Sequence, residues 1–364
     1  MDGVRKAVTH ASQGGDLDPL SPASWSLSES VGVFALCALV ITVLGIWITR
    51  VVDQLADRTG LGEAVAGAVL LGASTSAGGS VLSVTAAWQG HPELAMSNAL
   101  GGIAVQTLFL VVADLAYRRA NLEHAAASAP NMLQNALLIT LLGLILLAPT
   151  LPGISLWGIH PITPILLVLY IYGIHLVRGA RLYPMWKPSV TRETREDTPD
   201  DTSAMPSLAR LCITFLLLMI GLGLAGWVLA PTANNIALKT GLSQTAVGVL
   251  LTAVSTSIPE LVTSIAAVRR GALTLAVGGI IGGNAFDTLF TAASDIAYRP
   301  GSIYHTMTAD VILWVSLTLV MSSILMMGLI RRQEQGPGRI GWESVTIMVL
   351  YFLGVLLLLS DMNG

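Results

Sequence analysis

The sequence predicts an all-α polytopic membrane protein whose ten transmembrane helices form two inverted five-helix repeats. Three observations support this fold class: an apolar composition, ten apolar stretches long enough to cross a bilayer, and a segment that occurs twice. Apolar residues make up 53% of the 364 residues and charged residues only 11%, whereas a soluble domain is usually about 25% charged. The net charge of −3 is small and its basic residues are scattered, so nucleic acid is not an expected partner.

The ten apolar stretches define the expected spans, because a helix needs about 20 mostly apolar residues to cross the hydrocarbon core. The polar segment 179–207 separates five stretches from five and is predicted to be a linker. The chain then divides into a tail (1–29), a first membrane half (30–178), the linker and a second membrane half (208–364). The predicted spans are 30–49, 62–88, 94–116, 131–149, 160–178, 208–230, 243–268, 273–296, 309–330 and 343–360.

The distribution of Lys and Arg predicts the orientation, because short cytoplasmic loops retain these residues. With both termini extracytoplasmic and the linker 179–207 cytoplasmic, nearly all of the 19 basic residues fall inside. The exceptions are Arg5, Lys6, Lys239 and Arg299. We therefore expect a multi-pass protein of the cell membrane in this orientation.

An internal repeat gives the strongest pattern. Residues 61–119 align without gaps on residues 242–300, at a shift of 181. An odd number of spans separates equivalent helices, so the two copies cross the membrane in opposite directions. Inverted repeats of this kind place a substrate site near the midplane, where broken helices meet. The matches include Gly67 with Gly248, Ser74–Ser76 with Ser255–Ser257, Ser83 with Ser264, Gly90 with Gly271, and Gly101–Gly102 with Gly282–Gly283.

The second copy carries two carboxylates, Glu260 and Asp287, inside an apolar stretch. An ionisable side chain at membrane depth is costly and is by default a candidate for an ion or substrate site. Pro259 and several glycines lie beside them, as expected for broken helices. We therefore predict a cation site here.

These residues resemble the α-repeats of the calcium/cation antiporter superfamily, which includes the sodium/calcium exchangers. In the second copy the resemblance rests on Thr256–Leu261, Gly271 and Gly282–Asp287, and in the first copy on Thr75–Ser76 and Gly90–Ala95. It is firmest over the two repeats, and the layout of five spans plus five extends it to the whole chain. The resemblance implies an antiporter that exchanges Ca²⁺ for Na⁺ or H⁺ by alternating access.

The resemblance also implies the ligands. Glu260 and Asp287 correspond to charged ligands of the second copy, whereas the first copy offers Gly79 and Gln106 at the equivalent positions. One acidic ligand is therefore missing. Ca²⁺ prefers six to eight oxygens, and the expected donors also include nearby backbone carbonyls. The full set of side-chain ligands is Glu260, Asp287, Gln106, Thr256, Ser257, Thr75 and Ser76.

Alternatives remain at this point. A site with two carboxylates could serve another cation, such as Mg²⁺, Mn²⁺ or a monovalent ion, and the chain could also be a structural or sensory relative without transport. No zinc-ligand spacing, nucleophile elbow or phosphate loop indicates an enzyme. We expect inorganic cations and the lipid bilayer as partners and no tightly bound cofactor; the oligomeric state is open.

Six further residues have plainer interpretations. Asp114 with Arg118, and Asp295 with Arg299, are spaced four residues apart near helix ends and predict interfacial ion pairs. His91 and Glu93 are expected to be solvated loop residues.

Overall fold

A computed structural model of the chain describes residues 24–59, 72–117, 120–187, 189, 206–336 and 340–361. Within these ranges, nine helices are long and apolar enough to cross a membrane. The predicted second span, 62–88, begins outside the described residues, and its described part forms α4 (Gly72–Thr75) and α5 (Ala77–Trp88). The other membrane helices are α2 (Leu27–Thr59), α6 (Pro92–Ala116), α8 (Ala129–Leu147), α9 (Ile162–Leu182), α10 (Leu208–Thr240), α11 with α12 (Gln244–Ala246 and Val254–Arg270), α13 (Leu273–Ala297), α14 (Ala309–Arg331) and α15 (Trp342–Asp361).

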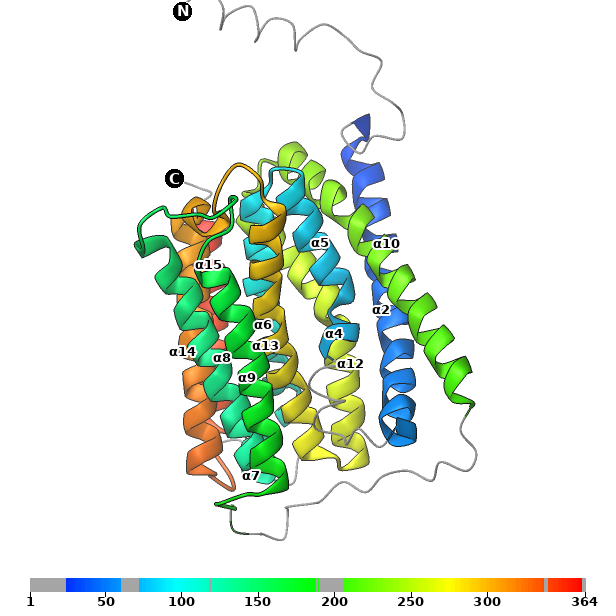
Figure 1. Cartoon of the computed structure of the whole chain (residues 1–364), viewed down its shortest axis with the longest axis vertical. Helices are drawn as coiled ribbons and strands as arrows, with labels where there is room; N and C mark the ends of the chain where they lie inside the picture. Colours follow the sequence, from blue (N-terminus) through cyan, green and yellow to red (C-terminus); the bar gives the residue numbers. More distant parts are fainter. Residues whose placement is uncertain are drawn as a thin grey trace, which may run out of the picture.

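Two helices are much longer than predicted. α2 and α10 each have 33 residues, or about 50 Å at 1.5 Å per residue. This exceeds the roughly 30 Å hydrocarbon core, so helices of this length must tilt or extend beyond it. They pack against each other at one side of the molecule, where α10 runs on a slant (Figure 1).

Both copies of the repeat contain a break in the helix that carries the Thr-Ser pair. In the second copy a π-helix (Val247–Ala253) separates α11 from α12, and in the first copy a turn at Ser76 separates α4 from α5. π-helical turns inside α-helices occur frequently at functional sites. The breaks lie beside the residues predicted to bind the cation.

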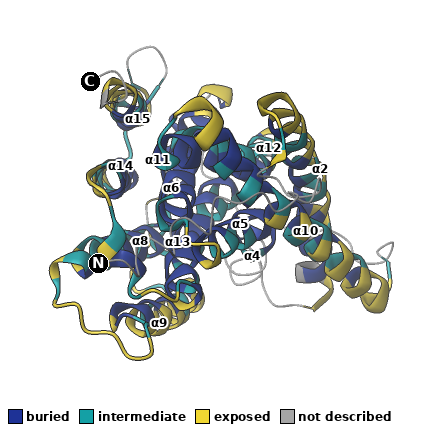
Figure 2. Ribbon diagram, turned by 90° about the horizontal axis from the view of Figure 1, so that it is seen from above, coloured by how far each residue is buried: buried dark blue, intermediate teal, exposed yellow. Residues whose placement is uncertain are grey.

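The helices α6 and α13 form the centre of the molecule. Most of their side chains are buried, and seen from above they lie between α2 and α10 on one flank and α8, α9, α14 and α15 on the other (Figure 2). The start of α2 and the end of α15 lie at one end of the bundle, which we call the terminal face (Figure 1). The opposite end holds the end of α9, the start of α10 and the short helix α7 (Leu122–Ala126), and we call it the linker face (Figure 1).

Close glycine contacts show the repeat in three dimensions. A Cβ atom on Gly45 of α2 would overlap Pro259 of α12, and a Cβ atom on Gly226 of α10 would overlap the carbonyl oxygen of Gly78 of α5. Gly45 and Gly226 are 181 residues apart, as are Gly78 and Pro259. The shift seen in the sequence therefore extends to α2 and α10.

Candidate cation site

The predicted ligands come together where the two copies meet. Thr256, Ser257 and Glu260 lie on α12 and Asp287 on α13, whereas Thr75 ends α4 and Gln106 lies midway along α6. The seventh predicted ligand, Ser76, occupies the break between α4 and α5. All seven side chains are buried.

Hydrogen bonds join the two copies at this point. Ser76 Oγ donates to Glu260 Oε1 at 3.1 Å. Gln106 Nε2 donates to Asp287 Oδ2 at 2.7 Å and to Ser257 Oγ at 3.3 Å. Gln106 and Asp287 are equivalent residues of the two copies, so the pseudo-symmetric positions contact each other directly.

The two acids belong to one site. Asp287 interacts electrostatically with Glu260, and it also contacts the Ser76 hydroxyl. The described residues hold no group of three or more His, Cys, Asp or Glu side chains arranged for a metal. The formal charge offered by the site is therefore the pair of carboxylates.

Three oxygens of the site are buried without a hydrogen-bond partner among the described residues: Glu260 Oε2, Asp287 Oδ1 and Gln106 Oε1. Leaving a buried polar atom unsatisfied costs about 1–3 kcal/mol, and more for a charged group. A carboxylate accepts but does not donate, and Gln106 turns its NH₂ group toward Asp287, which leaves its oxygen as an acceptor. These three oxygens have free lone pairs, and lone pairs on oxygen are what a bound cation requires.

The threonine hydroxyls of the two Thr-Ser pairs lie near backbone carbonyl oxygens of their own helices. Thr256 Oγ1 donates to the carbonyl oxygen of Thr252 at 2.9 Å, and Thr75 Oγ1 lies 3.4 Å from the carbonyl oxygen of Gly72. A hydroxyl whose proton is engaged still has lone pairs to offer. Their oxygens are neutral acceptors in the same buried region as the two acids.

Gly79, which occupies the position of the missing acid, has Thr256 and Phe290 as neighbours. A Cβ atom built on Gly79 would lie 3.4 Å from Thr256 Oγ1 and 3.6 Å from Phe290, which is ordinary van der Waals contact. The first atom of a longer side chain therefore fits at Gly79 without displacing the backbone.

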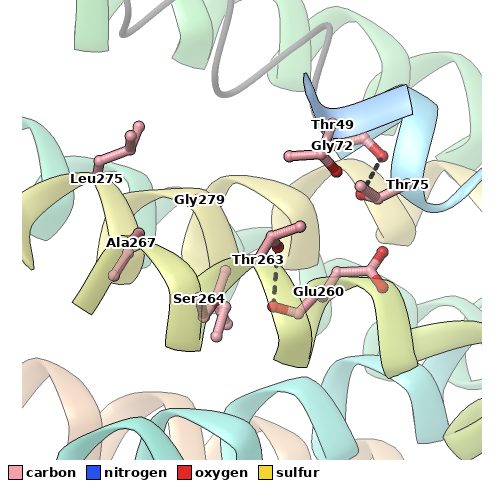
Figure 3. Close-up of a pocket in the computed structure, with 11 residues that line it drawn as sticks. Thr49, Gly72, Thr75, Glu260, Thr263, Ser264, Ala267, Leu275 and Gly279 are labelled. Carbon is pink, nitrogen blue, oxygen red and sulfur yellow. Dashed lines mark hydrogen bonds between the residues drawn. The ribbon is translucent and has the colours of Figure 1, made fainter. Parts of the chain in front are cut away.

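A pocket that the sequence did not predict adjoins Glu260. This pocket begins at Glu260 and follows α12 and α13 past Thr263, Ser264 and Gly279 toward the end where these two helices join (Figure 3). Figure 1 places that junction at the linker face. Thr49 of α2 also lines this pocket. The match of Ser264 with Ser83 in the repeat was the available sign that this position matters.

Two plainer expectations were wrong. Asp295 does not rely on Arg299: it accepts hydrogen bonds from the backbone N–H groups of His160 and Ile303 and from Thr163 Oγ1. Glu93 is not a free loop residue, because it accepts hydrogen bonds from Thr245, and His91 contacts Gln244. Arg118 lies outside the described residues.

The chain matches the sodium/calcium exchanger protein family over residues 29–177 and 210–360. It belongs to this family. Among curated relatives of the exchanger, CaxA of Alkalimonas amylolytica is 28% identical over 310 residues, which cover 83% of this chain and 89% of CaxA. The inner membrane protein YrbG of Escherichia coli K12 is 26% identical over 82% of this chain and 89% of its own length.

Solved structures of exchangers share the fold. The H⁺/Ca²⁺ exchanger CAX superposes with a TM-score of 0.68 at 14% identity and covers 97% of this chain and 85% of its own. The sodium-calcium exchanger NCX_Mj superposes with a TM-score of 0.59 at 20% identity, over 91% of this chain and 99% of its own. The predicted fold class, two inverted repeats in a multi-pass membrane protein, is confirmed.

Proposed function

We propose that this protein exchanges Ca²⁺ for Na⁺ or H⁺ across the membrane by alternating access. The cation binds between the two copies of the repeat. Glu260 and Asp287 supply its charged ligands, and Gln106 supplies a neutral one. The hydroxyls of Thr75, Ser76, Thr256 and Ser257 and nearby carbonyls complete the shell.

One observation carries this proposal: three buried acceptors from α6, α12 and α13 have no hydrogen-bond partner among the described residues. Two carboxylates balance the charge of one divalent ion. They also balance two monovalent ions or two protons, so either kind of cargo leaves the site neutral and able to reorient through a low-dielectric membrane. The family membership and the named cargoes of CAX and NCX_Mj agree with this reading.

Replacing Glu260 by Gln tests the site. We expect wild-type protein in liposomes to take up Ca²⁺ when an outward gradient of Na⁺ or H⁺ is imposed, and Glu260→Gln to abolish this uptake because one of the two charges is lost. Glu29→Gln is the matched control, since Glu29 lies on the exposed first turn of α2. Unchanged flux in Glu260→Gln would remove the site assignment.

The same assay separates the alternatives. Competition by Mg²⁺, Mn²⁺ and monovalent ions identifies the preferred cargo, because an ion that shares the site reduces Ca²⁺ uptake. A folded wild-type protein in which no gradient drives any uptake would instead identify a relative without transport.

A further inference from the structure

A buried amide bridge joins α5 to α6 on the terminal side of the cation site. Asn98 Nδ2 donates to the carbonyl oxygen of Gly79 at 3.1 Å and to Ser83 Oγ at 2.9 Å. The Asn98 side chain is 2% exposed. One amide group thus uses both its protons to hold the two helices of the first copy together.

The second copy has equivalent helices but no amide side chain at the equivalent position. The residues 181 positions after Gly79, Ser83 and Asn98 are Glu260, Ser264 and Gly279. All three line the pocket that leads to the cation site. A Cβ atom built on Gly279 would meet no atom of the described residues within 4 Å. Where the first copy is bridged by an amide, the second copy is therefore hollow.

The two positions lie toward opposite ends of the bundle. α5 and α6 join at residues 89–91 on the terminal face, whereas α12 and α13 join at residues 271–272 on the linker face (Figure 1). Because the copies are inverted, the bridge at Asn98 and the hollow at Gly279 occupy the same place in two opposing access paths. Among the described residues, the pocket thus extends from Glu260 toward the linker face, whereas the amide of Asn98 joins α5 to α6 on the terminal side.

We propose that Asn98 is a lock on the terminal-side access path, and that the glycine at its pseudo-symmetric position, Gly279, leaves the linker-side path open. This proposal rests on the proposed alternating access of the site. For the terminal side to open, α5 and α6 must separate and both hydrogen bonds of Asn98 must break. Asn98 is a positioning residue, because it holds the helices and is not itself a ligand of the cation.

Thiol labelling tests the lock without requiring transport. Single cysteines replace Ser83 or Ser264 in protein whose own Cys37 and Cys212 are changed to Ala, and a membrane-impermeant maleimide is applied to each face in turn. We expect Ser264→Cys to label from the linker face and Ser83→Cys to resist labelling from both faces. In Ser83→Cys the bond from Asn98 to Gly79 remains.

Two further substitutions remove the amide from the first copy or add one to the second. Adding Asn98→Gly should raise labelling of Ser83→Cys from the terminal face on the order of tenfold, the change expected for losing about one net hydrogen bond. Adding Gly279→Asn should protect Ser264→Cys, whereas Gly279→Ala, which adds no amide, should not. The Gly279 variants add side-chain atoms and remove no hydrogen bond of the native protein. They therefore test the proposed lock even if Asn98→Gly fails to fold.

Equal labelling of Ser83→Cys with and without Asn98, or unchanged labelling of Ser264→Cys in Gly279→Asn, would overturn the proposal. These results are independent of the flux assay. Liposomes that show no exchange would contradict the proposed function, whereas labelling that ignores residues 98 and 279 would contradict the lock alone.

Discussion

At the scale of single residues, the cation site is defined by an asymmetry between equivalent positions. Glu260 in the second copy is equivalent to Gly79 in the first, and Asp287 is equivalent to Gln106. Each pair therefore contributes one negative charge. The neighbourhood remains built for ligands, since Ser76, Ser257 and Gln106 all contact the acids or each other. The loss of charge therefore changes the ion balance of the site more than its shape.

Restoring the acid at position 79 tests this view. Gly79→Glu should raise the affinity for Ca²⁺ or change the number of coupling ions, because a third carboxylate adds both charge and oxygen ligands. Calcium titration of the purified protein, together with flux at several Na⁺ and H⁺ gradients, measures both quantities. Gly79→Gln has the same shape without the charge and is the matched control. Identical affinity and stoichiometry in wild type and Gly79→Glu would contradict the charge argument.

At the scale of elements, α2 and α10 stand apart from the rest of the bundle. They pack extensively against each other and meet the repeat helices at two glycine contacts, Gly45 on Pro259 and Gly226 on Gly78. Contacts without a side chain allow helices to approach closely. If alternating access holds, these crossings are where α2 and α10 would slide past the helices that carry the site.

Gly226→Ala should destabilise the protein, because the added methyl group overlaps a backbone carbonyl, which cannot swing away as a side chain can. Overpacking of this kind costs about 1–3 kcal/mol. Thermal unfolding in detergent measures the loss. Gly32→Ala on α2 is the control: its Cβ meets no described atom within 4 Å, and alanine favours a helix over glycine by about 1 kcal/mol. Equal melting temperatures for the two variants would refute the close contact.

At the scale of the whole molecule, the same set of hydrogen bonds links the helices at each end of the bundle. Asp114 accepts hydrogen bonds from the backbone N–H groups of Leu122 and Gly341 and from Ser344 Oγ. Asp295 accepts them from residues that are 181 positions away from these three, namely Ile303, His160 and Thr163. Each aspartate therefore ties the end of a central helix, α6 or α13, to the start of a helix from the other half.

The two ends differ in one neighbour. Beside Thr163 lies the hydroxyl of Tyr304 at 3.2 Å, whereas the equivalent neighbour of Ser344 is the carboxyl of Glu123 at 3.4 Å. Burial, followed by the charges of Asp114 and Glu343, raises the pKa of Glu123 well above its ordinary value. When it holds its proton, Glu123 is neutral like the tyrosine at the equivalent position of the terminal face.

This difference predicts a pH dependence of stability. Because the folded pKa of Glu123 is raised, the folded protein holds a proton that the unfolded chain releases above about pH 4.3. Stability should therefore fall as pH rises from there to the folded pKa. Glu123→Gln should flatten this decline in a series of thermal unfolding experiments, while Tyr304→Phe should leave it unchanged. Parallel declines in wild type and Glu123→Gln would contradict a buried proton.

The sequence predicted the fold because the bilayer imposes it. Lipid offers no partner to backbone N–H and C=O groups, so apolar stretches of span length must be helical. The gap-free shift of 181 then predicted the inverted halves, whose equivalent residues meet at the midplane. The family resemblance named Glu260, Asp287 and Gln106 as ligands. The ends of α2 and α10 were missed, because both continue through less apolar residues beyond the expected span.

The tertiary structure alone decided which atoms meet. Sequence spacing suggested that Asp295 pairs with Arg299, but the start of α9 from the other half brings the His160 N–H group and the Thr163 hydroxyl to this carboxylate instead. Likewise, Asn98 and Gly279 occupy equivalent places in the sequence, yet only packing makes one a bridge and the other a hollow. The physical reason is that periodicity and the repeat fix a residue's depth and face, whereas its partners depend on how closely helices that are distant in the chain approach each other.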